Sequence, residues 1–74
     1  MNTIKKLNNI QKIRWEMAVS LRELASLSDV SYTTINMIEN GRCYPTQLVM
    51  MKIAKALKCN VCDVFILDYD GIDL

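Results

Sequence analysis

Histidine is absent from the 74 residues, and only three cysteines are present. A structural zinc site uses four Cys or His ligands, so Cys43, Cys59 and Cys62 are too few to form one alone. Cys59 and Cys62 have C-x-x-C spacing, but no strand pattern lies beside them, and free structural thiols are expected in a reducing compartment. The sequence also lacks a glycine-rich phosphate loop and a carboxylate pair in an apolar setting. We therefore expect no metal, no cofactor and no enzymatic activity.

Glycine and proline are scarce, with two and one residues. No apolar run approaches the ~18 residues needed to cross a bilayer, and the first residues lack the apolar core of a secretion signal. A cytoplasmic protein without a membrane partner is therefore expected. Apolar side chains make up 51% of the chain, which favours a compact helical domain. We predict one domain over residues 1–74, with a core at about 7–65 and an acidic tail or dimerisation segment at 66–74.

A large excess of one charge is also lacking, since the net charge is +1. The charges are unevenly distributed. Residues 1–58 hold nine basic and four acidic residues, a balance of +5, whereas residues 59–74 hold four aspartates and no base. The basic part can neutralise a few phosphates, which favours salt-sensitive DNA binding of moderate strength. A randomly mixed surface is the alternative interpretation of the same charges.

The most informative stretch is residues 30–41. Ser31 is a good N-cap for a short helix, and Gly41 can adopt the left-handed conformation that ends one. Ile35 and Ile38 share one side of this helix. The residues that point elsewhere are uncharged, and they are Tyr32, Thr33, Asn36, Met37 and Asn40. Because hydroxyls, amides and a flexible apolar side chain suit the edges and methyl groups of DNA bases, this face is a candidate reading surface.

Helical patterns also lie on both sides of this stretch. Apolar residues three or four apart predict a first helix over about 4–17. Its inner face would comprise Leu7, Ile10, Ile13 and Met17. Ser20 and Glu23 form a capping-box pattern that begins a second helix, which ends near residue 27. Thr46 is expected to cap a fourth helix and Asn60 a short fifth helix.

Short motifs recur in a characteristic order along the chain. They are Ile13-Arg14, Ser20-Leu21-Arg22-Glu23-Leu24-Ala25, Val30-Ser31, Ile35, Ile38-Glu39-Asn40-Gly41-Arg42, Pro45-Thr46 and Lys52-Ile53-Ala54-Lys55-Ala56-Leu57. Together they resemble the Cro/CI or Xre-like helix-turn-helix regulators of the lambda-repressor type, over about residues 7–65. The resemblance implies an all-α fold of five helices, with the third helix, at about 32–40, in the major groove. It also implies a sequence-specific transcriptional regulator that binds double-stranded DNA, and we expect a repressor.

The resemblance assigns roles to single residues. Base contacts are implied for Tyr32, Thr33, Asn36 and Met37. The Asn36 amide can pair with N6 and N7 of adenine. Phosphate contacts are implied for Ser31, Asn40, Arg42 and the backbone amides around Leu21. For two of these residues an alternative interpretation stays open. Tyr32 could simply cover the edge of the core, and Met37 could be spare apolar surface.

The resemblance also implies an ion pair and three chain reversals that affect the stability of the domain. Arg14 and Glu39 take the positions of a partly buried ion pair that joins the first helix to the end of the third. Ala18, Asp29 and Lys58 stand where relatives have glycines at chain reversals. These three residues should cost some stability, because only glycine adopts the left-handed conformation freely.

A homodimer is expected, because a single helix-turn-helix unit contacts few bases. The candidate contact residues are apolar groups that the predicted core does not use, namely Trp15, Leu48, Met51, Phe65 and Leu67. Residues 65–69 are compatible with a short C-terminal strand at this contact. Alternatively, the tail folds back on its own domain and covers Trp15. A second class of function also stays open, in which the domain is an antitoxin or another protein-interaction module and DNA binding is secondary.

Overall fold

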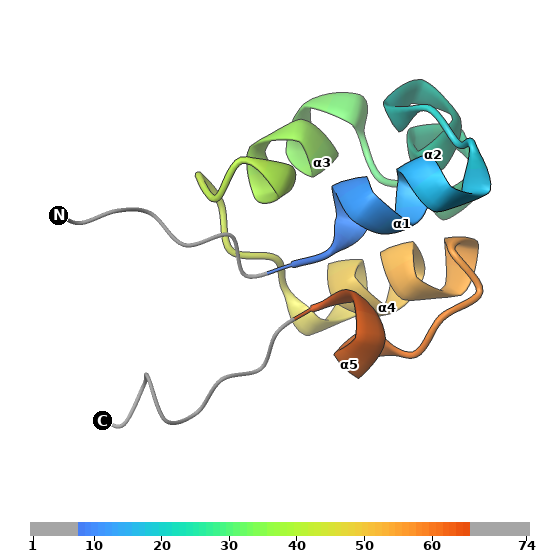
Figure 1. Cartoon of the computed structure of the whole chain (residues 1–74). Coiled ribbons are helices and arrows are strands. Elements are labelled where there is room, and N and C mark those ends of the chain that lie inside the picture. Colours follow the sequence, from blue (N-terminus) through green and yellow to red (C-terminus); the bar gives the residue numbers. More distant parts are fainter. Residues whose placement is uncertain (1–7, 66–74) are drawn as a thin grey trace, which may run out of the picture.

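A computed structural model describes residues 8–65, and this part of the chain forms five helices and no strand (Figure 1). The helices are α1 (Ile10–Met17), α2 (Leu21–Ser28), α3 (Tyr32–Glu39), α4 (Gln47–Ala56) and α5 (Val61–Val64). The all-α class and the five-helix order predicted from the sequence are confirmed. Leu7 and Leu67, and residues 66–74 as a whole, lie outside the described residues.

The core lies between all five helices. Each helix contributes a side chain with no exposed surface, and these are Ile10, Leu24, Ile35, Ile53 and Val64. Burying one such side chain contributes about 1.5–3 kcal/mol. α2 packs against both α3 and α4, and α4 also packs against α5. The two helices that matter most for the candidate site, α2 and α3, are therefore held by the same core.

The two ends of the described chain lie side by side, where Asn8 and Phe65 form an isolated antiparallel bridge (Figure 1). The Asn9 amide donates to the Val64 carbonyl at 2.6 Å, and the Asn9 side chain donates to the Asp63 carbonyl at 3.2 Å. These bonds hold Asn8 and Asn9 outside the helix. The prediction that the first helix includes these two residues is therefore wrong, and α1 begins at Ile10.

The inner face of α1 is shorter than predicted. Ile10 is buried and Ile13 is half-buried, but the Met17 side chain is 40% exposed. Met17 is the last helical residue, and Ala18 after it adopts the left-handed conformation that ends the helix. The apolar spacing in the sequence extends to Met17, but at this position α1 no longer faces the core.

The chain reverses at Ala18, Asp29 and Lys58, with φ of 59°, 59° and 58°. These are the three positions at which the sequence suggested a left-handed residue other than glycine. Gly41 also has a positive φ, 74°, where α3 has ended. The left-handed conformation costs roughly 1–2 kcal/mol for a residue with a Cβ atom, so the core tolerates local strain at three reversals.

The caps of the last two helices differ from each other. The Thr46 hydroxyl accepts a hydrogen bond from the Val49 amide at 3.2 Å, as expected. Asn60 occupies the N-cap position of α5, but its side chain makes no capping hydrogen bond. Its carbonyl instead accepts from the Asp63 amide at 2.9 Å. The predicted side-chain cap at Asn60 is therefore wrong.

Candidate nucleic-acid interface

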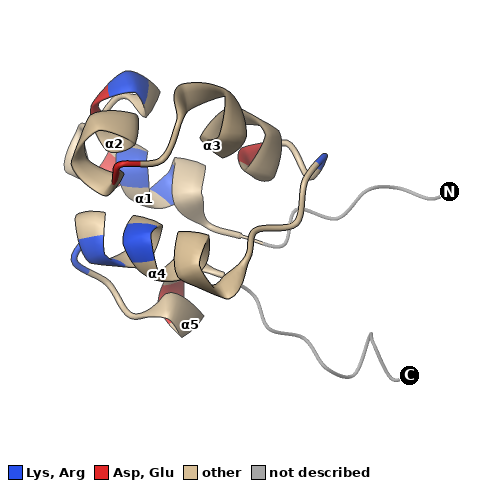
Figure 2. Cartoon of the chain, turned by 180° about the vertical axis from the view of Figure 1, so that it is seen from behind, with Lys and Arg blue, Asp and Glu red and all other residues tan. Residues whose placement is uncertain are grey.

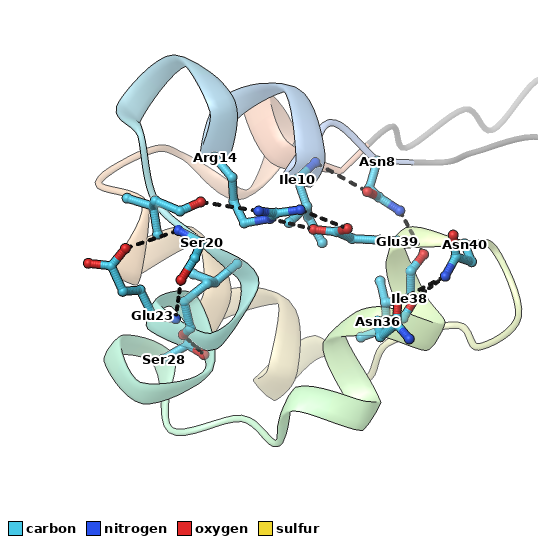
Figure 3. Close-up of polar contacts among 12 residues, drawn as sticks. Asn8, Ile10, Arg14, Ser20, Glu23, Ser28, Asn36, Ile38, Glu39 and Asn40 are labelled. Carbon is cyan, nitrogen blue, oxygen red and sulfur yellow. Dashed lines mark hydrogen bonds and ion pairs between the residues drawn. The ribbon is translucent and has the colours of Figure 1, made fainter.

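α2 and α3 are joined by a three-residue turn with well-defined ends. The Ser20 hydroxyl accepts from the Glu23 amide at 2.9 Å, and the Glu23 carboxylate accepts from the Ser20 amide at 3.0 Å. This reciprocal capping box begins α2 (Figure 3). Asp29 then turns the chain in the left-handed conformation, and the Ser31 hydroxyl caps α3 by accepting from the Thr34 amide at 3.1 Å. Local side-chain chemistry thus fixes where both helices begin.

α3 is fixed to the domain along one side. Ile35 and Ile38 are buried in the core, and Val30 before the helix is buried with them. The Asn8 side chain donates to the Ile38 carbonyl at 2.9 Å and also accepts from the Ile10 amide at 3.2 Å (Figure 3). Asn8 therefore links the last turn of α3 to the start of α1.

A buried ion pair provides a second link between α1 and α3. Arg14 Nε and Nη2 donate to the two carboxylate oxygens of Glu39 at 2.7 and 3.2 Å. Arg14 Nη1 donates in addition to the Val19 carbonyl at 3.1 Å. Both side chains are less than 10% exposed. The structure therefore contains the pair that the resemblance implied, with a bidentate geometry that orders both partners.

The opposite side of α3 is exposed and uncharged. It carries Tyr32, Thr33, Asn36 and Met37, all in exposed positions. The sequence of α3 holds no Lys or Arg, in agreement with the absence of blue from α3 in Figure 2, and its acidic residue, Glu39, is paired with Arg14. The structure thus brings the four predicted base-contacting residues together on one surface. Tyr32 and Met37 are 47% and 38% exposed, so neither is used mainly to cover the core.

Arg22 is a contributor to this surface that the sequence did not reveal. Its guanidinium lies over the Tyr32 ring, 5.9 Å from the ring centroid. Such a cation–π contact contributes about 0.5–1 kcal/mol at an exposed site. It connects the first turn of α2 to the first turn of α3. Because the two residues are on different helices, their spacing in the sequence gives no signal of the contact.

The predicted phosphate-contacting residues lie around this face but differ in whether their polar groups already make hydrogen bonds within the domain. The Leu21 side chain packs against the core, whereas the backbone at Leu21 opens α2. The Ser31 hydroxyl donates to the Thr34 hydroxyl at 2.7 Å. The Arg42 side chain is exposed, and its amide donates to the Met37 carbonyl at 2.9 Å. Arg42 is therefore a cation three residues beyond the end of α3.

Asn40, the fourth phosphate candidate, has its side chain engaged within α3. Its Nδ2 atom donates to the Asn36 backbone carbonyl at 2.9 Å and to Asn36 Oδ1 at 3.0 Å (Figure 3). A side-chain amide nitrogen has two hydrogens. With two acceptors on this nitrogen, the Asn40 side chain is directed toward Asn36 in this conformation rather than toward a phosphate oxygen.

The predicted dimer residues separate into two groups. Trp15, Leu48 and Met51 are 68%, 61% and 52% exposed. Phe65 is 3% exposed and belongs to the core, so its prediction as a subunit contact is wrong. The chain direction after α5 brings Phe65 back to Asn8 and buries its ring. The tail of the fold-back alternative, residues 66–74, lies outside the described residues, and within residues 8–65 Trp15 is exposed.

Leu48 and Met51 line a shallow groove between α4 and α5. The groove has a volume of about 520 Å³, and its other walls include Ala54, Cys59 and Val61. Lys52 and Lys55 lie at the same groove. It is therefore a mainly apolar surface with a basic margin, separate from the exposed face of α3.

The cysteines are all free, with Cys43 and Cys59 half-buried and Cys62 exposed. Cys59 packs against the core, and its Sγ atom contacts the Leu57 carbonyl at 3.3 Å. Within residues 8–65, no group of three or more His, Cys, Asp or Glu side chains is arranged to hold a metal ion. In the same part of the chain, no helix is long and apolar enough to cross a membrane.

Two helices joined by a tight turn, with the second exposing an uncharged polar face, define a helix-turn-helix DNA-binding domain. The family described as helix-turn-helix matches residues 10–64, and the chain belongs to this family. It is a DNA-binding transcription regulator of the Xre or lambda-repressor-like type. The family is one of regulators rather than enzymes.

Similar proteins have the same class of fold. An uncharacterised HTH-type transcriptional regulator from Methanothermobacter thermautotrophicus is 38% identical over 63 residues, which cover 84% of this chain and 91% of that protein. The clp gene regulator ClgR from C. glutamicum is 29% identical, with a TM-score of 0.70 over 88% of this chain and 83% of the other. The restriction-modification controller protein C.AhdI from Aeromonas hydrophila is similar in fold, with a TM-score of 0.72, 22% identity and coverage of 74% and 83%.

Proposed function

We propose that this regulator is a repressor that reads the major groove of its operator with the exposed face of α3. The observation that carries this proposal is a helix fixed on one side by Ile35, Ile38 and Glu39, while its other side exposes four uncharged residues. A rigid helix that exposes hydroxyl, amide and apolar groups suits base edges better than bulk solvent. Any operator contact is then made by a surface that is already ordered.

The four residues have different chemical abilities. Asn36 can accept from N6 and donate to N7 of adenine. Tyr32 and Met37 offer apolar surface to thymine methyl groups, and Arg22 over the Tyr32 ring restricts the position of that ring. The Thr33 hydroxyl can donate or accept. Asn36 is therefore the main hydrogen-bonding reader in this proposal.

Phosphates would set the register of α3 in the groove. The first amides of α2, around Leu21, have no acceptor within the helix and favour an anion. Arg42 supplies a cation at the other end of α3. The Ser31 hydroxyl can turn its hydrogen from Thr34 to a phosphate while its oxygen still accepts the Thr34 amide. Asn40 is left out of this set because its side-chain nitrogen is directed toward Asn36, and its role is treated below.

The test is binding to the promoter beside the protein's own gene, measured at several salt concentrations. We expect a protected footprint, binding that weakens steeply with salt, and loss of specific binding in Asn36→Ala. Cys62→Ala is the matched control, because Cys62 is also exposed but lies on α5. The absence of binding at any salt concentration would contradict the proposal and favour the protein-interaction role.

We propose further that the protein binds DNA as a homodimer joined through the groove between α4 and α5. Leu48 and Met51 are three residues apart on α4, both are more than half exposed, and both line this groove. Two copies would cover these side chains and place two α3 helices on half-sites about one helical turn apart. Trp15 is also more than half exposed but does not line the groove.

Light scattering tests the dimer. We expect the mass of two chains for the parent protein and of one chain for Met51→Glu, since a carboxylate in an apolar contact is costly to desolvate. Trp15→Ser removes exposed apolar surface elsewhere and should leave the mass unchanged. A single-chain mass for the parent at high protein concentration would rule out the dimer.

A further inference from the structure

Two asparagines on the exposed side of α3 are joined by their side chains. Asn40 Nδ2 lies 2.9 Å from the Asn36 carbonyl oxygen and 3.0 Å from Asn36 Oδ1 (Figure 3). Both residues are exposed and lie one helical turn apart. Neither side chain contributes to the core. The contact therefore lies on the exposed surface of α3 and does not belong to the core.

The backbone determines the orientation of both amides. The Asn36 carbonyl oxygen can only accept, so the Asn40 side chain must direct its nitrogen toward it. The same nitrogen faces the Asn36 side chain, which must then direct its oxygen toward Asn40. A terminal amide is otherwise free to exchange its oxygen and nitrogen by a half-turn about its last bond. Here that half-turn would place two N–H groups against each other.

We propose that Asn40 is a positioning residue that holds the Asn36 amide in the orientation that reads adenine. This inference rests on the proposed contact between Asn36 and a base. With Oδ1 turned toward Asn40, Oδ1 keeps one free lone pair, and Nδ2 keeps both hydrogens. One acceptor and one donor side by side match N6 and N7 of adenine.

The fixed orientation acts against guanine. Guanine offers two acceptors, O6 and N7, in place of the donor and acceptor of adenine. A free asparagine amide can turn its nitrogen toward these two acceptors. An amide held by Asn40 instead places Oδ1 against O6, where two oxygens repel and no hydrogen bond forms. Asn40 thereby increases the discrimination between the two purines without contacting DNA itself.

Removal of the Asn40 side chain leaves in place the backbone hydrogen bonds that end α3. The Asn40 backbone amide donates to the Asn36 carbonyl at 3.1 Å, and the Gly41 amide donates to the Ile38 carbonyl at 3.1 Å. These bonds remain in Asn40→Ala. The melting temperature of that variant should therefore match that of the parent, and a change in base preference is not explained by a loss of folding.

The experiment begins with selection of duplexes from a randomised DNA library by the parent protein and by Asn36→Ala. The position at which Asn36→Ala loses the preference of the parent is the base that Asn36 reads. Dissociation constants are then measured for four duplexes that differ only at this position. We expect the parent to prefer adenine over guanine and Asn40→Ala to reduce that ratio at least about fivefold, the lower end of what a bidentate pair supplies.

Two further variants separate positioning from affinity. In Asn40→Asp, a carboxylate can only accept, so it attracts Asn36 Nδ2, reverses the amide and also reduces the adenine preference. This variant keeps the size of the side chain and provides the test if Asn40→Ala does not fold. Arg42→Ala should weaken all four duplexes by the same factor, because a phosphate contact carries no base preference.

The possible failures are distinguishable. If Asn36→Ala keeps the base preference of the parent at every position, the proposed base contact is wrong and the role of Asn40 is wrong with it. If Asn36→Ala loses the preference while folded Asn40→Ala and Asn40→Asp both keep the ratio of the parent, only the role of Asn40 is overturned.

Discussion

Arg14 on α1 and Glu39 on the last turn of α3 form a bidentate ion pair that is almost completely buried. The pair spans 25 residues of sequence and joins the helix that opens the fold to the helix that carries the candidate reading face. Arg14 also holds the Val19 carbonyl after the first chain reversal. One side chain thus fixes the turn after α1 and the end of α3 together.

The first prediction concerns this pair. Arg14→Ala should lower the free energy of unfolding by about 3–5 kcal/mol, because it leaves the Glu39 carboxylate buried without a partner. DNA affinity should fall mainly because less protein is folded. Urea denaturation measures the loss, and a variant as stable as the parent would contradict it.

Two control variants test whether the unpaired buried charge causes that loss of stability. Arg14→Met combined with Glu39→Leu removes both charges, so its loss should be much smaller than that of Arg14→Ala. Lys52→Ala breaks the exposed pair with Asp29, whose atoms are 3.9 Å apart. It should change stability by less than about 1 kcal/mol, because solvent screens exposed charges.

The second prediction concerns the capping box of α2. Ser20→Ala should destabilise the domain by about 1 kcal/mol, because the Glu23 amide loses its acceptor. Ser26→Ala is the matched control, since Ser26 is exposed on the same helix and takes no part in the cap. Thermal melting compares the two. Equal melting temperatures for the two variants would show that the cap contributes nothing.

The third prediction concerns the left-handed residue after α1. Ala18→Gly should raise stability by up to about 1 kcal/mol, because glycine removes the steric cost of a positive φ and loses part of that gain to its more flexible unfolded chain. Ala25→Gly, inside α2, should lower stability by about 1 kcal/mol or more. Denaturation of both variants checks the opposite signs. Destabilisation by Ala18→Gly would contradict the argument.

The fourth prediction concerns Arg42. Arg42→Ala should reduce the slope of log affinity against log salt by about 1, because one phosphate contact is lost. Lys58→Ala removes the same charge from the connection between α4 and α5 and should leave the slope unchanged. Equal slopes for Arg42→Ala and the parent would remove Arg42 from the phosphate set.

Local chemistry made much of the fold predictable. The caps at Ser20, Ser31 and Thr46 depend on residues three positions away, so a single sequence displays them. The outward face of α3 followed in the same way from helical spacing. The ion pair between Arg14 and Glu39 could be predicted only from the resemblance to a family, because 25 residues separate the partners.

Two of the wrong predictions and one missed contact have a common physical cause. Whether Asn8 and Asn9 are helical depends on their bonds to residues 63–65, more than 50 residues away. The burial of Phe65 depends on the same return of the chain. Arg22 over Tyr32 likewise depends on how two helices cross. Each of these contacts is fixed by tertiary packing, which periodicity along one helix does not report.

The exposed face of α3 has a consequence for how such a regulator changes over time. Tyr32, Thr33 and Asn36 are exposed and lie outside the hydrophobic core. On the proposed base contacts, we expect substitutions there to alter the DNA sequence that is bound while the melting temperature stays nearly constant. A single mutation on this face would then change the preferred operator while the protein stays folded.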